Sequence, residues 1–383
     1  MKRIYWILLI VLLAGLLSLP ACGPVQRHYE AGLILGDIRA GEEDSRLKRT
    51  RPAPERETVN YTGVTGEARV ADLYTPGGEI KADLVLVHGF TEDGRRDPRL
   101  IQFAETLARA GFRILAPEVE TLTRMDVSPE NVQDVVDASR WLDEHGDGDG
   151  VGVAALSFSV ATAVLAAMEP EGQPHIGWVV GVGGYYDLID TLTYVTTGYY
   201  TEDGREVFLE PRVEGRWVVL LTQLDRVPDE DDRELLERIA YRHLDDPGTD
   251  TEDKAEDLTP SGRAVYDLLT NRDPERVPEL LADLPEPVRD EIEALNLARR
   301  DLSGLQAYLL LVHGRDDDVI PWTQSQALLE AAPASGAELR LVTGLTHVDV
   351  DPGLLDAWRL LRAVNRLLVL RDDPPAPGER DDL

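Results

Sequence analysis

The fold of this chain is decided by residues 151–159, which read VGVAALSFS. The first six are a short apolar run, as expected for a strand buried on both faces of a parallel sheet. Residues 160–168 continue as an apolar helix, so Ser157 falls on a tight turn between strand and helix. Ala155 and Ser159, two positions before and after it, are small enough for a turn that brings backbone close to backbone. The pattern predicts a projecting serine, although a serine in front of a helix is also a common N-cap.

Short apolar runs alternate with helical patterns on both sides of this motif. The expected strands cover residues 84–87, 112–116, 151–156, 178–182, 308–312 and 339–342. The expected helices include residues 100–108, 128–142, 160–168 and 354–370. This alternation predicts the α/β class, with a mostly parallel central sheet and helices on both faces.

The alternation stops between residues 191 and 304. Helical patterns there are separated by acidic, proline-dotted loops such as residues 245–257. Residues 217–221 fit a strand or a buried helical turn equally well. We interpret 191–304 as a helical cap inserted between two parts of the core, residues 58–190 and 305–370. A separate small domain is the alternative.

Two further polar groups follow late strands. HGRDDDVIP at residues 313–321 comes after one strand, and His347 follows another. Because the carboxyl ends of parallel strands meet at one edge of a sheet, Ser157, an aspartate and His347 are expected to converge. A serine hydroxyl is a poor nucleophile, so a histidine must take its proton and a carboxylate must orient that histidine.

From about residue 60 to 370 the chain resembles the α/β-hydrolase family, including its dienelactone-hydrolase-like and esterase-like members. The order serine, acid, histidine is the order found in that family. The family's acid loop, His-Gly-x-x-Asp-x-x-(Val/Ile)-Pro, matches here and selects Asp317 over its two aspartate neighbours. The resemblance therefore implies an α/β-hydrolase fold and the triad Ser157, Asp317 and His347. Asp187, which follows another strand, is an alternative acid.

The resemblance also implies an oxyanion hole. LVLVHGF at residues 84–90 looks like the family's strand and oxyanion loop, so the backbone N–H groups of Phe90 and Phe158 would hold the oxyanion. The family's Gly-x-Ser-x-Gly differs here, because Ala155 and Ser159 replace both glycines. His88 is expected to fix loop geometry rather than to transfer protons.

These motifs predict a serine hydrolase that cleaves a carboxylic ester, or a related acyl bond, through an acyl-enzyme. Its substrate would be a small-molecule or lipid-like acyl compound. A peptidase or acyltransferase on the same fold, and a non-catalytic envelope lipoprotein, are the alternatives. The histidines are scattered and no glycine-rich phosphate loop follows the first strand, so the sequence predicts neither a metal nor a cofactor.

The N-terminus predicts secretion. A basic start, an apolar run from Ile4 to Leu19 and a small residue before Cys22 are typical of a signal peptide over residues 1–21. The ending LPAC resembles the bacterial lipobox. That resemblance implies cleavage before Cys22, its lipidation, and a place in the bacterial cell envelope, on the outer membrane facing the periplasm in a Gram-negative host. An uncleaved anchor helix is the alternative. Residues 22–57 are expected to form a tether with one apolar patch, residues 33–35, that can dock on the body, and residues 371–383 are expected to form a polar, disordered tail.

Charge narrows the possible partners. The 39 Lys and Arg residues against 71 Asp and Glu give a formal net charge of −32. Such a surface repels phosphates, which argues against nucleic acids and anionic lipid headgroups as ligands. The scarcity of lysine fits either a saline habitat or a GC-rich genome that favours arginine codons. The single cysteine excludes an intrachain disulfide. The sequence leaves the oligomeric state open.

Overall fold

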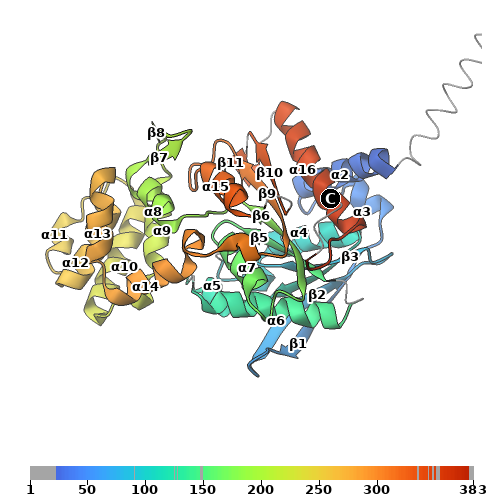
Figure 1. Cartoon of the computed structure of the whole chain (residues 1–383), viewed down its shortest axis with the longest axis horizontal. Helices are drawn as coiled ribbons and strands as arrows, with labels where there is room; N and C mark the ends of the chain where they lie inside the picture. Colours follow the sequence, from blue (N-terminus) through green and yellow to red (C-terminus); the bar gives the residue numbers. More distant parts are fainter. Residues whose placement is uncertain are drawn as a thin grey trace, which may run out of the picture.

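The computed structural model of the chain describes residues 23–89, 91–124, 126, 128–146, 150–333, 336–343, 345–346, 349–350 and 354–378. Its main feature is an eight-stranded sheet in the order β1-β2-β4-β3-β5-β6-β9-β10 (Figure 1). The strands are β1 (Glu55–Thr62), β2 (Ala68–Thr75), β3 (Ala82–Leu86), β4 (Phe112–Pro117), β5 (Val151–Leu156), β6 (Ile176–Val182), β9 (Tyr308–Gly314) and β10 (Ala337–Val342). From β4 to β10 all neighbours pair in parallel, and only β1–β2 and β2–β4 are antiparallel.

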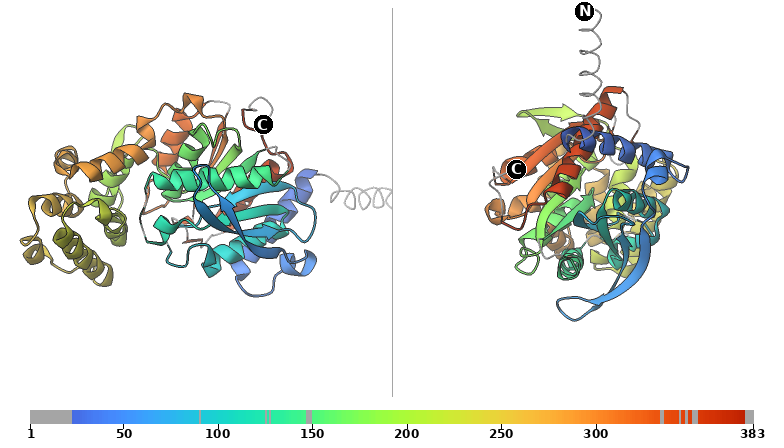
Figure 2. Two further views of the ribbon diagram at one scale, coloured as in Figure 1. Left: turned by 90° about the horizontal axis from the view of Figure 1, so that it is seen from below. Right: turned by 90° about the vertical axis from the view of Figure 1, so that its right-hand side faces the viewer.

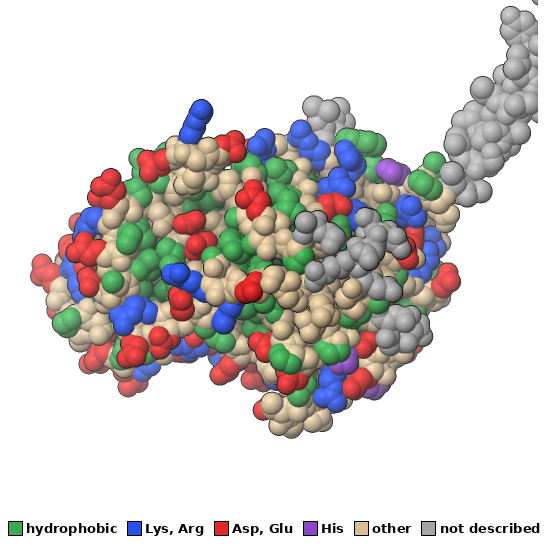
Figure 3. Space-filling model, viewed as in Figure 1, with side chains coloured by type: hydrophobic (Ala, Val, Ile, Leu, Met, Phe, Trp, Pro, Cys, Tyr) green, Lys and Arg blue, Asp and Glu red, His purple; other side chains and the backbone are tan. Residues whose placement is uncertain are grey.

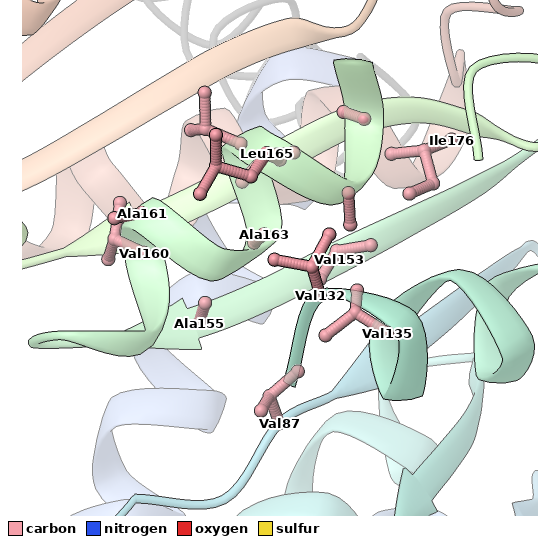
Figure 4. Close-up of a cluster of buried hydrophobic side chains, with 14 of the residues drawn as sticks. Val87, Val132, Val135, Val153, Ala155, Val160, Ala161, Ala163, Leu165 and Ile176 are labelled. Atoms are coloured by element: carbon pink, nitrogen blue, oxygen red, sulfur yellow. The ribbon is translucent and has the colours of Figure 1, made fainter. Parts of the chain in front are cut away.

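Helices cover both faces of this sheet. On one face α6 (Glu130–Glu144) and α7 (Ser159–Met168) pack over Val85 and Val153, and Figure 4 shows part of this cluster. On the other face α4 (Pro98–Arg109) and α16 (Leu354–Asp372) pack over Leu84. Successive residues of the inner strands thus enter opposite cores, which is why β3, β5, β6 and β9 consist mainly of apolar residues.

The segment between β6 and β9 forms a separate helical lobe at one end of the molecule (Figures 1 and 2). Its own core includes Trp217, Leu236 and Tyr266. Residues 217–221 are helical, which settles the ambiguity left by their periodicity. The lobe consists of α8 (Leu188–Thr197), the ribbon β7 (Tyr199–Glu202) and β8 (Arg205–Phe208), α9 (Val213–Leu221), α10 (Glu230–Asp245), α11 (Glu252–Ala255), α12 (Pro260–Thr270), α13 (Val277–Asp283) and α14 (Glu286–Leu295). We call it the cap.

The N-terminal segment differs from the expected tether. It forms α2 (Gly23–Ala40) and α3 (Arg46–Thr50), and α2 packs against α16 and α4. Ile34, from the expected apolar patch, is buried. Two polar contacts also join α2 to the body: Glu30 pairs with the buried Arg371 at 3.0 Å, and Thr106 Oγ1 donates a hydrogen bond to Asp37 at 2.6 Å.

The start of the expected disordered tail also packs on the body. Pro375 is buried, and a Cβ built at Gly177 would lie 2.1 Å from the carbonyl oxygen of Pro375. Residues 379–383 lie outside the described residues. No helix among the described residues is both long enough and apolar enough to cross a bilayer.

Candidate active site

The turn after β5 places Ser157 in a strained conformation. Its φ is +55°, a value that non-glycine residues rarely adopt, and its N–H donates to the carbonyl oxygen of Val182 at 2.8 Å. The helix α7 begins two residues later, at Ser159. A strained residue between a buried strand and a helix projects its side chain from the edge of the sheet, as the sequence predicts for Ser157.

Close packing around this turn depends on glycines outside the motif. A Cβ at Gly184 would lie 2.5 Å from Val160 Cβ, and one at Gly181 would lie 2.7 Å from Val160 Cγ1. The first turn of α7 therefore approaches β6 more closely than any side chain would allow. The serine motif alone does not point to these two positions, because Gly181 lies on the next strand and Gly184 in the loop that follows it.

The loop after β9 holds three adjacent aspartates in different surroundings. Asp316 is exposed, and Asp318 is partly buried and pairs with Arg212 at 3.2 Å. Asp317 is only 1% exposed, and its Oδ1 accepts hydrogen bonds from the N–H groups of Val319 and Ile320, both at 2.9 Å. The fold thus removes one carboxylate of the three from water and fixes its orientation.

The same edge of the sheet receives the chain on both sides of residue 347. Val342, at the end of β10, pairs with Gly314, at the end of β9. The short strands β11 (Leu345–Thr346) and β12 (Asp349–Val350) pair with each other, and β11 contacts β9. His347 itself lies outside the described residues, so its place in a triad stays a prediction.

A cavity of about 330 Å³ lies between the cap and the core, with Ser157 in its wall. The core also contributes Phe158, Tyr185 and Val319. Most of the wall comes from aliphatic side chains of the cap: Leu188, Leu192, Val195, Val218, Val219, Leu220, Val265, Leu268, Leu269, Leu284, Val288, Ile292 and Leu295. Hydrophobic side chains gather between the two lobes on the face shown in Figure 3. The candidate nucleophile therefore faces an apolar compartment.

Comparisons with known proteins bear on the fold. No protein-family profile matches the sequence, and no curated protein matches it. A protein from Legionella pneumophila described as a hydrolase superposes with a TM-score of 0.54 at 14% identity, over 86% of this chain and 94% of that one. The cell-wall-degrading esterase LipA from Xanthomonas oryzae gives 0.51 at 15% identity, over 88% and 93%. The chain has the α/β-hydrolase fold.

In the α/β-hydrolase fold the loop after β3 carries the first oxyanion donor. Phe90 lies outside the described residues, but His88, two positions earlier, is buried. Its Nε2 accepts from the N–H of Val119 at 3.1 Å, and its Nδ1 lies 2.9 Å from the carbonyl oxygen of Gly89. Burial lowers the pKa of His88, which favours the neutral ring that these partners require. His88 thus holds this loop in place, as expected.

The second expected donor, Phe158, stands at the N-terminus of α7. Oriented N–H groups at a helix N-terminus favour a developing negative charge. Its ring packs against Tyr185 at a centroid distance of 5.3 Å, and the Tyr185 hydroxyl donates to the carbonyl oxygen of Leu295 at 3.1 Å. The turn that carries the candidate nucleophile is thus packed onto the C-terminal end of the cap.

The other candidate groups have structural roles. Asp187 is the N-cap of α8, and its Oδ1 also accepts from Asn296 Nδ2 at 3.2 Å. Both ring nitrogens of His313 are occupied: Nδ1 lies 2.7 Å from Ser325 Oγ, and Nε2 lies 2.9 Å from the carbonyl oxygen of Ile320. Cys22 lies outside the described residues. Among the side chains that the structure describes, no group of three or more His, Cys, Asp and Glu could hold a metal ion.

Proposed function

We propose that this chain is a serine hydrolase that cleaves the carboxylic ester of an apolar acyl group. The observation that carries the proposal is a serine at φ +55° facing an apolar cavity beneath a cap. A strained backbone at a strand-to-helix turn is maintained only where the surrounding structure enforces it, and such strain clusters at active sites.

The proposed reaction uses the residues that the sequence predicts for the site. Ser157 Oγ attacks the ester carbonyl while His347 takes its proton, and Asp317 holds the imidazole in the tautomer that accepts it. The N–H groups of Phe90 and Phe158 hold the oxyanion. His347 returns the proton to the leaving alcohol, which leaves an acyl-enzyme. Water, deprotonated by His347, then releases the acid and frees Ser157.

The cavity indicates the kind of acyl group. At about 330 Å³ it lies near the lower limit for ligand pockets, so it fits one short or medium acyl chain rather than a complete multi-chain lipid. Each methylene buried there contributes about 0.8 kcal/mol, or roughly a fourfold gain in kcat/KM. The gain in kcat/KM should end when the acyl chain fills the cavity. Nitrophenyl esters of increasing acyl length test this directly.

Covalent labelling tests the nucleophile. A fluorophosphonate probe should label the wild-type chain and the Ser303→Ala variant, whose changed side chain is exposed, but not Ser157→Ala. Ester hydrolysis should disappear with the label. Labelling that persists in Ser157→Ala would reject the proposal, and a properly folded wild-type chain that never labels would favour a non-catalytic protein.

We further propose that the chain is anchored to the bacterial envelope through a lipid on Cys22. Support comes from the lipobox-like LPAC, preceded by an apolar run and a basic start. Mass spectrometry of the mature protein should find an acylated cysteine at its first position. A Cys22→Ser variant should keep its signal peptide and carry no lipid, whereas an unmodified mature start elsewhere would contradict the anchor.

A further inference from the structure

Three large apolar side chains stay exposed near the start of α2. The exposed fractions are 42% for Val25, 51% for Tyr29 and 53% for Trp358. Tyr29 lies one turn after Val25 on α2, and Trp358 of α16 stacks on His28 with ring centroids 6.3 Å apart. Val25, His28 and Tyr29 share one face of α2 and Trp358 stacks on His28, so three of the six large apolar side chains exposed among the described residues form one cluster.

Cations border this cluster. The guanidinium of Arg46 lies 5.5 Å from the Tyr29 ring centroid, and Arg362 follows Trp358 by one turn of α16. Within the described chain, no carboxylate lies at ion-pair distance from either arginine. We call these six residues the aromatic face: Val25, His28, Tyr29, Arg46, Trp358 and Arg362.

The helices around the aromatic face carry a net positive charge, although the whole chain is strongly negative. The helices α2, α3 and α16 carry nine Lys and Arg against four Asp and Glu, in a chain whose net charge is −32. Residues 41–45, between α2 and α3, add three acids, and the balance still stays positive by two. Figure 3 shows Lys and Arg gathered over this end of the molecule. The argument from net charge against anionic headgroups therefore does not hold at this face.

We propose that the aromatic face lies against the headgroup layer of an anionic bilayer. Tyr and Trp favour this layer because their rings are apolar and their polar edges stay hydrated. Each arginine close to an anionic leaflet strengthens binding by roughly fivefold. The inference goes beyond the lipid anchor and is independent of the proposed hydrolysis.

The position of α2 in the sequence makes this contact accessible. Val25 lies three residues after Cys22, so a lipid on Cys22 would place Val25 within about 11 Å of the anchor point. Because α2 is packed on the body rather than free, such an anchor would orient the whole molecule. The cap lies at the opposite end from α2 (Figures 1 and 2), so it would point away from the bilayer.

Tryptophan quenching by lipid tests the contact. The full-length chain is reconstituted into vesicles whose lipids carry bromine high on the acyl chains, either zwitterionic or containing phosphatidylglycerol. The contribution of Trp358 is the difference between wild type and Trp358→Phe, and Trp217→Phe gives the same difference for a buried residue of the cap. We expect the Trp358 contribution to lose most of its emission in anionic vesicles, and the Trp217 contribution to lose none.

A matched pair of charge variants tests the role of lipid charge. Reversing Arg46 and Arg362 to Glu should abolish the quenching of Trp358. Reversing Arg238 and Arg299, whose side chains are 61% and 53% exposed elsewhere on the molecule, should leave it unchanged. Trp358 emission that is unquenched in anionic vesicles would overturn the proposal. Equal quenching in zwitterionic vesicles, or after reversal of Arg46 and Arg362, would overturn it too.

Discussion

The exchange of Asp317 for Asn tests the triad most sharply, because the structure determines how the new amide would be oriented. Oδ1 of Asp317 accepts two backbone N–H bonds, from Val319 and Ile320. The amide oxygen of Asn must take that place, since an NH₂ group there would face two donors and lose both bonds. The NH₂ group then takes the place of Oδ2. An acceptor is thereby replaced by a donor with little change in shape.

A donor on this side favours the wrong tautomer of His347, which leaves no free nitrogen to take the proton of Ser157. In another serine hydrolase the same exchange lowers kcat by about 10⁴-fold, or roughly 5.4 kcal/mol of transition-state stabilisation. We expect a loss of similar size here. Asp316→Asn should stay within about threefold of wild type, or about 0.7 kcal/mol, because Asp316 is exposed.

Single-turnover acylation by a nitrophenyl ester is the suitable assay, because it isolates the step in which His347 accepts the proton. Asp318→Asn loses the ion pair with Arg212 in the cavity wall, so we expect its effect on ester binding to exceed its effect on the acylation rate. Asp187→Asn controls for the other carboxylate near the site. A folded Asp317→Asn variant that acylates within about tenfold of wild type would refute the assignment.

Three further changes probe the fold around the site. Gly181→Ala should lower the free energy of unfolding by about 1–3 kcal/mol, because the new Cβ would lie 2.7 Å from Val160 Cγ1. In a double-mutant cycle measured by urea denaturation, adding Val160→Ala should restore part of the lost stability, and strictly additive effects would refute the contact. Burial lowers the pKa of His88, so the unfolded chain binds a proton there more readily and stability should fall as the pH drops below about 6.5. The Tm of His88→Gln should fall less steeply with decreasing pH than the Tm of wild type, and an equal slope would contradict this. With a net charge of −32, Tm should climb between about 0.1 M and 1 M sodium chloride, as the Debye length shrinks from about 10 Å to about 3 Å, and a flat curve would contradict self-repulsion.

The strands β3, β4, β5, β6 and β9 could be predicted because each is buried on both faces, whereas β10 is an edge strand whose residues are mostly half-buried. Five of the six expected strands fall within observed ones, and the sixth, residues 84–87, runs one residue past the end of β3. The edge strand β1 was missed because most of its residues are exposed, and backbone pairing with β2 needs no apolar alternation. The ribbon of β7 and β8 was missed for the same reason, since its residues are exposed or only partly buried.

The apolar patch of the N-terminal segment was expected to dock on the body, but the helix α2 that carries it could not be predicted from local pattern. Among its buried residues only Ala31 and Ile34 are apolar, too few to produce a clear helical stripe. The charged pair that supports it joins Glu30 to Arg371, 341 residues away. Such a contact is known only once the fold has brought α2 beside α16.

In the candidate site, too, the local part could be predicted from the sequence and the contacts between distant segments could not. Ser157 was predicted because its motif is local, with strand, turn and helix contiguous in the sequence. Its surroundings were not, because Gly181 lies on another strand, Gly184 lies in the loop after that strand, and the cavity wall comes from four cap helices. The pair of Arg212 and Asp318 joins the cap to the acid loop and was also missed.

The presence of Ala155 and Ser159, where the family pattern has glycine, is explained by the glycines of the neighbouring strand and loop. A close helix–strand approach can be achieved by small residues on either partner, and here β6 provides Gly181 and the loop that follows β6 provides Gly184. Replacing Ala155 and Ser159 with glycine should therefore add flexibility without relieving a clash, and lower stability by roughly 0.5–1 kcal/mol at each position. The same exchange should leave the acylation rate close to wild type. A large gain in the acylation rate would instead mean that Ala155 and Ser159 hold the turn in a conformation that places Ser157 poorly for attack.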